Sequence, residues 1–235
     1  LESLYTLEKK NHEQEQELNQ ERLRFYTNIT HELRTPLTLI LGPLEDMQKD
    51  TSLPTRQAQK LSVIHQSALR LLNLINQILE FRKTETQNKK LCVCKGNIVP
   101  LIHEIGLKYK ELNQKKAIDF QIQIEKEEMP LFFDKEIITI ILDNLISNAI
   151  KYTEQGKITL SLYPTTRNGV TYTEIKVSDT GYGISAEDLP HVFDRYYQES
   201  GKHQASGTGI GLALVRNLVE LHEGEIRVES IQNEG

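Results

Sequence analysis

Apolar side chains in the first part of the chain recur at alternating intervals of three and four positions, the spacing that places them on one side of a helix. One such stripe has a single polar member and consists of Leu23, Tyr26, Thr30, Leu33, Leu37, Ile40, Leu44 and Met47. A second stripe consists of Leu61, Ile64, Ala68, Leu71, Ile75 and Ile78. Residues 50–56 separate the two and contain Ser52 and Pro54, which predict a turn. The pattern therefore predicts a hairpin of two helices, with residues 1–20 as a weaker coiled-coil lead.

A lone hairpin cannot bury both stripes, because Leu72, Leu74 and Leu79 widen the second one beyond the contact line of a two-stranded coil. Two hairpins packed as a four-helix bundle can bury them, so we expect a homodimer through this region. The alternative is a monomeric hairpin whose stripes pack against the rest of the chain.

After residue 89 the pattern changes to short alternating runs mixed with helical periods. The alternating runs predict strands at residues 91–95, 117–125, 157–163, 171–178 and 225–230. The helical periods predict helices at residues 98–115, 135–152 and 208–222, and a polar, glycine-bearing stretch covers residues 182–206. We therefore expect an α+β fold with two domains: a helical domain at residues 1–89, and an α/β sandwich with a mixed sheet covered by helices at residues 90–235.

Length and composition agree with this division. The 235 residues exceed the usual size of one domain, and a chain with 38% apolar and 26% charged residues is typical of soluble globular proteins. The formal net charge of -5 argues against a nucleic-acid partner, which would need a concentrated basic face. No apolar run reaches the length of a membrane span. Cys92 and Cys94 would share one face of a strand, a poor arrangement for a mutual disulfide, and so favour a reducing compartment.

His31 lies one position after Thr30 and so at the solvent-exposed edge of the first stripe. The carboxylate of Glu32 can hold one imidazole nitrogen protonated and leave the other as a nucleophile. Thr35 falls one helical turn later on the same face, near enough to position a water at a phosphorylated imidazole. Pro36 removes a backbone donor and should loosen or bend the helix beside the histidine. These surroundings suit phosphoryl acceptance, although an exposed histidine alone is usually without a catalytic role.

A second group of polar residues lies on the helix predicted at residues 135–152. Asn144 and Asn148 are one turn apart and are expected to project together. Amide oxygens suit magnesium, which takes few protein ligands plus water and phosphate oxygens. Lys151 adds a positive charge within reach of phosphates. The alternative is a capping or surface pair of asparagines, but asparagine is disfavoured inside helices unless its side chain has another task.

Two glycine motifs follow. Asp179-Thr180-Gly181-Tyr182-Gly183 ends a predicted strand, where the carboxylate can accept a hydrogen bond from the exocyclic amine of adenine and the glycines let the backbone approach the ring. Ser206-Gly207-Thr208-Gly209-Ile210-Gly211-Leu212 opens the last predicted helix, whose N-terminal amides and dipole would hold phosphate. Either motif alone is weak, since turns use the same residues and nicotinamide sites have a similar glycine spacing.

The order of these motifs is more specific than any one of them. The string FYTNITHELRTPLTLIL at residues 25–41 closely resembles the phosphoacceptor motif of the sensor histidine kinases of two-component systems. The succession N-x-x-x-N, D-x-G-x-G and G-T-G-x-G-L is similar to that of the GHKL-type ATP-binding domain. The resemblance implies ATP- and magnesium-dependent autophosphorylation of a histidine and transfer to the aspartate of a response-regulator receiver. It also implies phosphatase activity on the same receiver.

The resemblance assigns a role to each matching residue. His31 would accept the phosphoryl group, with Glu32 as the assisting base and Thr35 as a phosphatase residue. Asn148 would be the magnesium ligand, with Asn144 beside it. The other nucleotide-binding residues would be Lys151, Tyr152, Asp179, Gly181, Gly183, Gly207, Thr208, Gly209, Gly211 and Leu212. Residues 182–206 would form a mobile ATP lid containing the aromatic motif Phe193-Asp194-Arg195-Tyr196-Tyr197.

The family's organisation also implies partners and a location. The chain would form a homodimer, meet a receiver domain that is separate or fused, and bind no nucleic acid. It would lie in the cytoplasm without direct membrane contact, as a piece of a membrane-anchored sensor. The signal, the cognate receiver, and whether phosphorylation occurs within or between subunits stay open.

The sequence departs from the family pattern in three places. Gln198 stands where many relatives have an arginine, which puts one contact to the γ-phosphate in doubt, and Glu223 replaces a customary glycine. The chain stops at Gly235, before the closing strand of the family, so we expect a sheet without one edge and weaker nucleotide binding.

Two alternative functions are weighed against the kinase. One is an ATP hydrolase of the same fold, which would carry a glutamate one helical turn before the metal-binding asparagine; this chain has Asn144 there. The other is a nucleotide-binding scaffold without catalysis, against which an intact His31 and Glu32 argue.

Overall fold

The structure, a computed structural model, describes residues 2–49, 53–85, 90–113, 117–198 and 209–235, with the backbone alone for residues 2–24 and 85. The chain divides into two compact units, Leu1–Lys89 and Lys90–Gly235. None of the described helices combines the length and the apolar character needed to cross a membrane.

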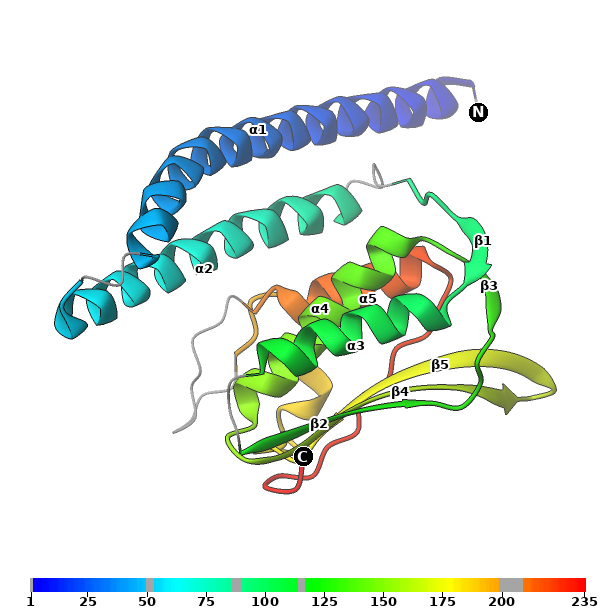
Figure 1. The fold of residues 1–235 in the computed structure, drawn as a ribbon. Coiled ribbons are helices and arrows are strands. Elements are labelled where there is room, and N and C mark those ends of the chain that lie inside the picture. The colour runs from blue at the N-terminus through cyan, green and yellow to red at the C-terminus, as the bar shows by residue number, and fades with distance from the viewer. Residues whose placement is uncertain (1, 50–52, 86–89, 114–116, 199–208) are drawn as a thin grey trace. The chain divides into compact units, whose positions relative to one another are not determined.

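The first unit is the predicted hairpin of two helices, α1 (Glu2–Gln48) and α2 (Thr55–Glu85). Helix α1 continues through both Pro36 and Pro43, and Figure 1 shows it as one unbroken ribbon that bends in its second half. Each proline removes one backbone donor from the helical ladder, which accounts for a bend without a break. The predicted turn at residues 50–56 is only partly described, because residues 50–52 lie outside the described part of the chain.

The stripe on α1 divides between two environments. Leu37 of the stripe packs with Leu41, which lies outside the stripe, and with Ala68 and Ile75 of α2 in a small buried cluster. The stripe residues Leu33, Ile40 and Met47, by contrast, keep about half of their surface exposed, at 47%, 49% and 49%. A stripe with this spacing is wider than the line along which two helices touch, so one hairpin buries only its inner edge.

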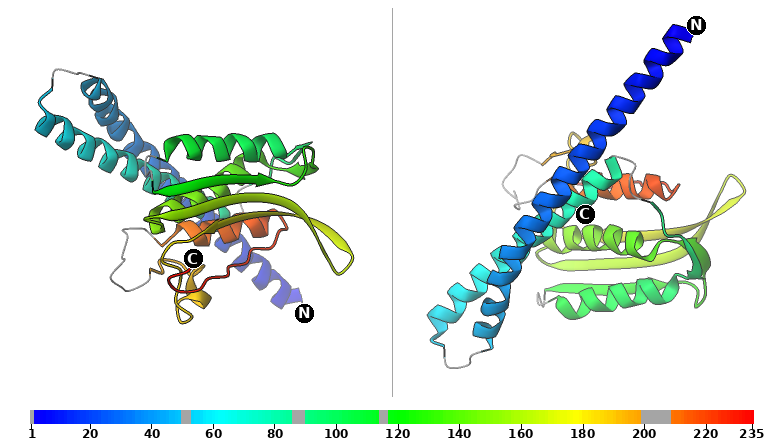
Figure 2. Two further views of the ribbon diagram at one scale, coloured as in Figure 1. Left: turned by 60° about the horizontal axis from the view of Figure 1, so that its bottom comes forward. Right: turned by 90° about the horizontal axis from the view of Figure 1, so that it is seen from above.

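The second unit combines a mixed sheet with helices. Its elements are β1 (Cys94–Asn97), α3 (Val99–Leu112), β2 (Ile118–Ile124), β3 (Pro130–Phe133), α4 (Lys135–Tyr152), β4 (Gly156–Arg167), β5 (Val170–Asp179), the short 3₁₀ helix η1 (Leu189–His191) and α5 (Gly211–Leu221). The three-stranded sheet has the order β2-β4-β5, with β2 parallel and β5 antiparallel to β4, and β1 pairs with β3 separately. Helices α3, α4 and α5 lie on one side of the three-stranded sheet (Figures 1 and 2).

The core of the second unit lies between these helices and the sheet. Alternate residues of β4, namely Ile158, Leu160 and Leu162, are completely buried, as the period of two in a strand requires. Leu142 and Ile146 of α4 pack against them in one cluster, because residues four apart share a face of a helix.

Most predicted elements are confirmed, and α4 has the predicted bounds of Lys135–Tyr152. Strand β1 begins at Cys94 rather than at residue 91, and the thiols of Cys92 and Cys94 are free and exposed. The short strand β3 was not foreseen, since four residues are too few to display an alternation. Helix α5 begins at Gly211, later than predicted, and residue 208 lies outside the described residues.

The predicted strand at residues 225–230 is wrong. In the described part of the chain this segment makes no ladder and forms no strand. Its alternation of charged residues with Ile226 and Val228 favours an extended backbone, but a strand also needs a partner edge whose backbone groups match. Side chains hold the segment instead, beginning with an ion pair of 3.4 Å between Arg167 of β4 and Glu225.

Candidate functional site

His31 is exposed on α1, as the sequence predicts. Glu32 beside it is also exposed, so both side chains are open to a partner molecule. The hydroxyl of Thr35 donates a hydrogen bond to the carbonyl oxygen of His31 at 3.1 Å. Pro36 has no N–H to offer the carbonyl of Glu32, so the helix has one bond fewer at this point. The group His31, Glu32 and Thr35 therefore lies on one exposed stretch of helix with a locally weakened backbone ladder.

The hairpin around His31 is held by polar contacts between the two helices. A guanidinium nitrogen of Arg34 donates to the side-chain oxygen of Asn76 at 2.8 Å, which joins α1 to α2. The guanidinium of Arg82 lies 4.7 Å from the ring centre of Tyr26, a cation–π contact between the same helices. Thr30, the polar member of the stripe, is buried and donates to the carbonyl oxygen of Tyr26 at 2.8 Å, so its hydroxyl is satisfied inside the hairpin.

Helix α4 positions the asparagine motif, and its start is set by Asp134. One carboxylate oxygen of Asp134 accepts from the N–H groups of Glu136 and Ile137, which is an N-cap. Asn144 is 7% exposed, and its amide nitrogen donates to the carbonyl oxygen of Ile140 at 2.8 Å. Asn148 is half-buried. Asn144 is thus the more buried of the two asparagines, and their joint projection stays a prediction.

The last turn of α4 carries a cation beside an aromatic ring. The ammonium of Lys151 donates to the hydroxyl of Tyr152 at 2.9 Å and lies 4.4 Å from the centre of its ring. The backbone carbonyl of Tyr152 accepts a hydrogen bond from the N–H of Tyr182 at 3.3 Å. The end of α4 and the loop after β5 are thus joined directly.

Asp179 ends β5 with one of its two carboxylate oxygens already occupied. Its Oδ1 accepts from the N–H of Gly181 at 2.9 Å and from the hydroxyl of Thr153 at 3.4 Å. Thr153 is completely buried, so its hydrogen bond holds the Asp179 carboxylate from the side of the protein interior. No described residue donates to Oδ2 of Asp179, which leaves that oxygen able to accept from a ligand amine.

In the loop after β5, backbone atoms of other segments occupy the space where the side chains of Gly181 and Gly183 would begin. A Cβ atom on Gly181 would lie 2.4 Å from the carbonyl oxygen of Tyr152, and one on Gly183 would lie 2.1 Å from that of Ile231. Gly183 also has a positive φ of 64°, which a residue with a side chain rarely adopts. These glycines are therefore required by the packing of the protein itself, and their role in the approach of an adenine ring stays a prediction.

The second glycine motif is only partly described, because Gly207 and Thr208 lie outside the described residues. Gly209 has a φ of 67°, and its carbonyl accepts from the N–H of Tyr196 at 2.9 Å. This bond joins the predicted aromatic motif to the start of α5. Gly211 begins α5, and a Cβ atom there would lie 3.0 Å from Oδ1 of Asn144, so α4 and α5 approach closely; Leu212 after it is half-buried.

Sequence reasoning missed two supporting contacts of the site. Thr153 supports Asp179, and its only sequence signal is that it follows the last residue of the α4 motif. Asp143 accepts from the hydroxyl of Tyr109 at 2.9 Å and from the ammonium of Lys108 at 3.0 Å, which ties α3 to α4. Burial, together with the charge of Asp143, raises the pKa of Tyr109 well above its ordinary value.

Comparison with known families covers both units. Residues 21–87 match the family described as the His Kinase A (phospho-acceptor) domain, and residues 133–235 match the Histidine kinase-, DNA gyrase B-, and HSP90-like ATPase family. Sensor histidine kinase YcbM of Bacillus subtilis is 35% identical over a match that covers 88% of this chain and 67% of that protein. The chain belongs to the histidine kinase family. The two family matches fall on the two compact units of this histidine kinase in the order that its motifs predict.

Other relatives are much longer than this histidine kinase chain. Histidine kinase P4 of Formosa agariphila is 38% identical over 96% of this chain but only 16% of its own length. Hybrid signal transduction histidine kinase D of Dictyostelium discoideum is 32% identical over 95% of this chain and 15% of its own length. The chain thus spans about one-sixth of these two relatives.

Two solved structures resemble this histidine kinase in fold. Full-length ShkA in complex with AMPPNP matches with a TM-score of 0.68 and 25% identity, over 88% of this chain and 43% of that one. Histidine kinase AdeS of Acinetobacter baumannii matches with a TM-score of 0.57 and 23% identity, over 86% of this chain and 92% of that one, which shows the fold alone.

Proposed function

We propose that this chain is the kinase core of a two-component sensor, which uses ATP and magnesium to phosphorylate its own His31 and then passes the phosphoryl group to a receiver aspartate. The observation that carries the proposal is an exposed histidine beside a carboxylate on α1, in the same chain as an ATPase-family unit with an open carboxylate oxygen at Asp179. The similar ShkA structure is a complex with AMPPNP, an ATP analogue, and so supports the choice of nucleotide.

The acceptor chemistry needs little from the protein beyond alignment. In the reacting complex Glu32 would accept a hydrogen bond from one imidazole nitrogen of His31 and leave the other nitrogen unprotonated as the nucleophile. The bond from phosphorus to the β,γ-bridging oxygen breaks as the nitrogen–phosphorus bond forms, and Glu32 takes up the proton of the ring. Because the transferred group is nearly detached in the transition state, in-line positioning and neutralisation of charge supply most of the rate.

The nucleotide site uses the groups of the second unit. Oδ2 of Asp179 accepts from the exocyclic amine of adenine, while Lys151 and Tyr152 lie at the end of α4 for contacts to the nucleotide. The glycines of residues 207–211 and the first amides of α5 would hold phosphate. Asn148 fits magnesium, because the residue is only half-buried and this metal takes few protein ligands. Magnesium held by Asn148 would supply positive charge that neutralises the negative charge developing on the phosphate oxygens.

The hydrolase alternative is less well supported. A hydrolase of this fold needs a base that activates water one turn before Asn148, and the residue there is Asn144. A carboxamide is not basic enough to take a proton from water, and the amide nitrogen of Asn144 already donates to the carbonyl of Ile140. Asn144 instead supports the contact of α4 with the first turn of α5.

We also propose that the kinase is a homodimer whose interface is the exposed apolar face of the hairpin. On α1 this face carries Leu33, Ile40 and Met47, and on α2 it carries Ile64, Leu71 and Ile78, which are 37–52% exposed. Exposed apolar side chains repeated along both helices favour burial against a second copy. A receiver domain as partner and a cytoplasmic location, where ATP is supplied and thiols stay reduced, complete the proposal.

The test is incubation of the chain with γ-labelled ATP and magnesium, followed by treatment of the labelled protein with acid or alkali. Phosphohistidine survives alkali and is lost in acid, whereas a phosphoserine shows the reverse. The variant His31→Gln should lose all label and still bind ATP, and His65→Gln on α2 is the matched control that should retain the label. Label that resists acid, or that persists in His31→Gln, would contradict the proposal.

A phosphatase activity on the receiver is the second part of the proposal, with Thr35 as the residue that orients the attacking water. Thr35 is four residues after His31 on an exposed face, and its hydroxyl is too weak a base to replace Glu32. The variant Thr35→Ala should therefore keep autophosphorylation and transfer but lose most of its ability to dephosphorylate the receiver. Parallel loss of both activities would make Thr35 a structural residue, since its hydroxyl also bonds the carbonyl of His31.

A further inference from the structure

The last residues of the chain pack against the loop that carries the proposed adenine contact. We call residues 225–235 the tail and residues 179–184 the adenine loop. The N–H of Ile184 donates to the hydroxyl oxygen of Ser230 at 2.8 Å, and the N–H of Asn233 donates to the carbonyl of Tyr182 at 2.6 Å. The hydroxyl of Ser230 donates in turn to the carbonyl of Gly235 at 2.8 Å. Ser230 therefore joins the backbone of the adenine loop to the end of the tail.

The backbones of the tail and the adenine loop are so close that side chains would not fit between them. The missing Cβ of Gly183 leaves space for the carbonyl oxygen of Ile231, which would be 2.1 Å from such an atom. At the other end, a Cβ on Gly235 would lie 2.0 Å from the carbonyl oxygen of Asp179. Contacts at both ends of the adenine loop mean that a shift of the tail would move the loop.

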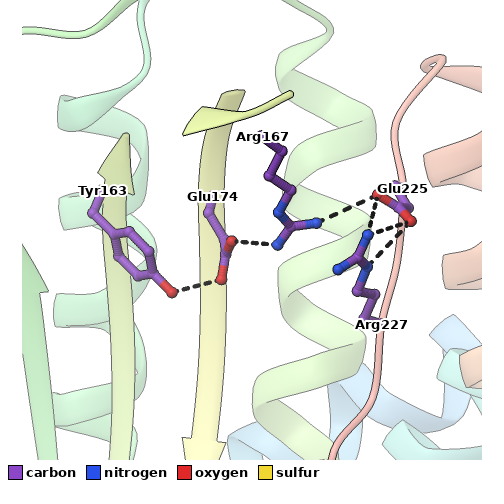
Figure 3. Close-up of polar contacts among 5 residues, drawn as sticks. All are labelled: Tyr163, Arg167, Glu174, Glu225 and Arg227. Carbon is purple, nitrogen blue, oxygen red and sulfur yellow. Dashed lines mark hydrogen bonds and ion pairs between the residues drawn. The ribbon is translucent and has the colours of Figure 1, made fainter. Parts of the chain in front are cut away.

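The tail is also fixed upstream, by a chain of polar side chains that begins on the β4–β5 hairpin (Figure 3). The hydroxyl of Tyr163 donates to Glu174, and the guanidinium of Arg167 bridges Glu174 at 3.0 Å and Glu225 of the tail at 3.4 Å. Arg227 donates to the same Glu225 at 2.8 Å. These bonds lower the pKa of Glu225, with Arg227 as the main cause, and so keep it charged. Side-chain contacts thus anchor the start of the tail, and Ser230 fastens its end to the adenine loop.

We propose that Ser230 is a positioning residue that sets the selectivity of this kinase for adenine nucleotides. The inference rests on the proposed role of Asp179 as the group that reads the adenine amine. The hydroxyl of Ser230 accepts from the N–H of Ile184, and the N–H of Gly181 donates to Oδ1 of Asp179, so Oδ2 is the oxygen that stays available to a ligand. A hydrogen bond weakens steeply when its angle or distance changes. Greater motion of the adenine loop should therefore weaken the bond between Asp179 and the adenine amine more than it weakens the contacts to phosphate.

The experiment compares ATP with inosine triphosphate, which has a carbonyl in place of the exocyclic amine, on the whole chain with magnesium. Calorimetry of the unaltered protein should show that ATP binds about tenfold more tightly or better, since the analogue leaves the carboxylate unpaired. In Ser230→Ala this ratio should fall by roughly threefold or more, with the affinity for inosine triphosphate unchanged. Ser230→Thr keeps the hydroxyl and should restore the ratio. Gln232→Ala, an exposed neighbour in the tail, is the matched control and should behave as the unaltered protein.

The outcomes separate the inference from the function on which it rests. Equal losses for both nucleotides in Ser230→Ala, or an unchanged ratio, would overturn the positioning role while leaving Asp179 in place. An unaltered protein that does not distinguish the nucleotides, or an Asp179→Ala variant that keeps the ratio, would overturn the role of Asp179 and the inference with it. If Ser230→Ala does not fold, Ser230→Cys has nearly the same size with a weak acceptor and carries the same expectation.

Discussion

Glu223 has a backbone conformation that is unfavourable for a residue with a side chain. It directly follows the cap of α5 and has a positive φ of 56°, a conformation that glycine usually supplies at the end of a helix. Two backbone bonds close the turn: the N–H of Gly224 donates to Val219 at 2.9 Å and that of Glu223 to Glu220 at 3.0 Å. The turn therefore forms in spite of the side chain, at the cost of some strain.

Replacing Glu223 by glycine should relieve this strain. We expect Glu223→Gly to raise the free energy of unfolding of the second unit by up to about 1 kcal/mol, part of the gain being offset by a more flexible unfolded chain. Chemical denaturation of the unaltered and variant chains measures the difference. Glu223→Ala removes the charge but keeps the strained backbone, so a similar gain in that control would show that charge, not conformation, is responsible.

The helix α1 carries two kinds of apolar residue that the spacing alone does not distinguish. Leu37 is 5% exposed and packs within the hairpin, whereas Ile40, three residues later, is 49% exposed. The first contributes to the stability of the hairpin itself. The second contributes only if another surface covers it.

The two residues should therefore respond differently to substitution. Leu37→Ala should lower the stability of the hairpin by about 2–5 kcal/mol, because it leaves a cavity in the small cluster between the helices. Ile40→Asp should leave the helical content almost unchanged and dissociate the proposed dimer, as sedimentation would show. Thr38→Asp, an exposed polar position on α1, serves as the control and should stay dimeric. A dimer that persists in Ile40→Asp would place the interface elsewhere.

The contact between α3 and α4 depends on Tyr109, whose hydroxyl bonds to Asp143 just before the asparagine motif. Burial raises the pKa of Tyr109 above its ordinary value of 10.0, so the folded protein keeps the phenol neutral where the unfolded chain would ionise it. Its contribution to stability is therefore complete below about pH 10 and is lost as the pH rises further.

The variant Tyr109→Phe tests this contribution. At neutral pH it should lower the free energy of unfolding by about 1 kcal/mol through the lost hydrogen bond. Above about pH 10 its stability should fall less steeply than that of the unaltered chain, because no buried phenol remains to ionise on unfolding. Tyr172→Phe at an exposed position of β5 should not change the slope. Equal slopes for Tyr109→Phe and the unaltered chain would contradict the assignment.

The chain as a whole consists of two units, each with a buried apolar cluster of its own. Two separate cores predict two thermal transitions. A ligand that binds only one unit stabilises that unit in proportion to the logarithm of its concentration relative to the dissociation constant.

Magnesium and ATP together should therefore raise only the transition of the second unit. At about one hundred times the dissociation constant the gain is roughly 2.7 kcal/mol, which scanning calorimetry resolves as a shift of one transition. A chelator or the variant Asn148→Ala should remove most of the shift, whereas His31→Gln should keep it. A shift of both transitions to the same extent would contradict separate roles for the two units.

The sequence predicted the central residues of the site better than the residues that hydrogen-bond to them from other parts of the chain. The bounds of α4 and the exposure of His31 follow from local periodicity and were predicted correctly. Thr153 and Ser230 were missed, because their partners are 26 and 46 residues away and no spacing marks a contact of that range. Helical geometry predicts that Asn144 and Asn148 share one face of α4, but the burial of Asn144 near the start of α5 depends on a contact that no local pattern marks.

By itself the sequence determined the two periodicities, the order of the motifs and hence the family, because each depends on residues near one another along the chain. Tertiary structure alone decided that β2 runs parallel to β4, that residues 225–230 form no strand, and which edge of the α1 stripe is buried. It also decided that the carbonyl of Ile231 fills the space beside Gly183. These features depend on which distant surfaces meet, and the free energy of such contacts comes from packing and hydrogen-bond geometry that local residue patterns do not encode.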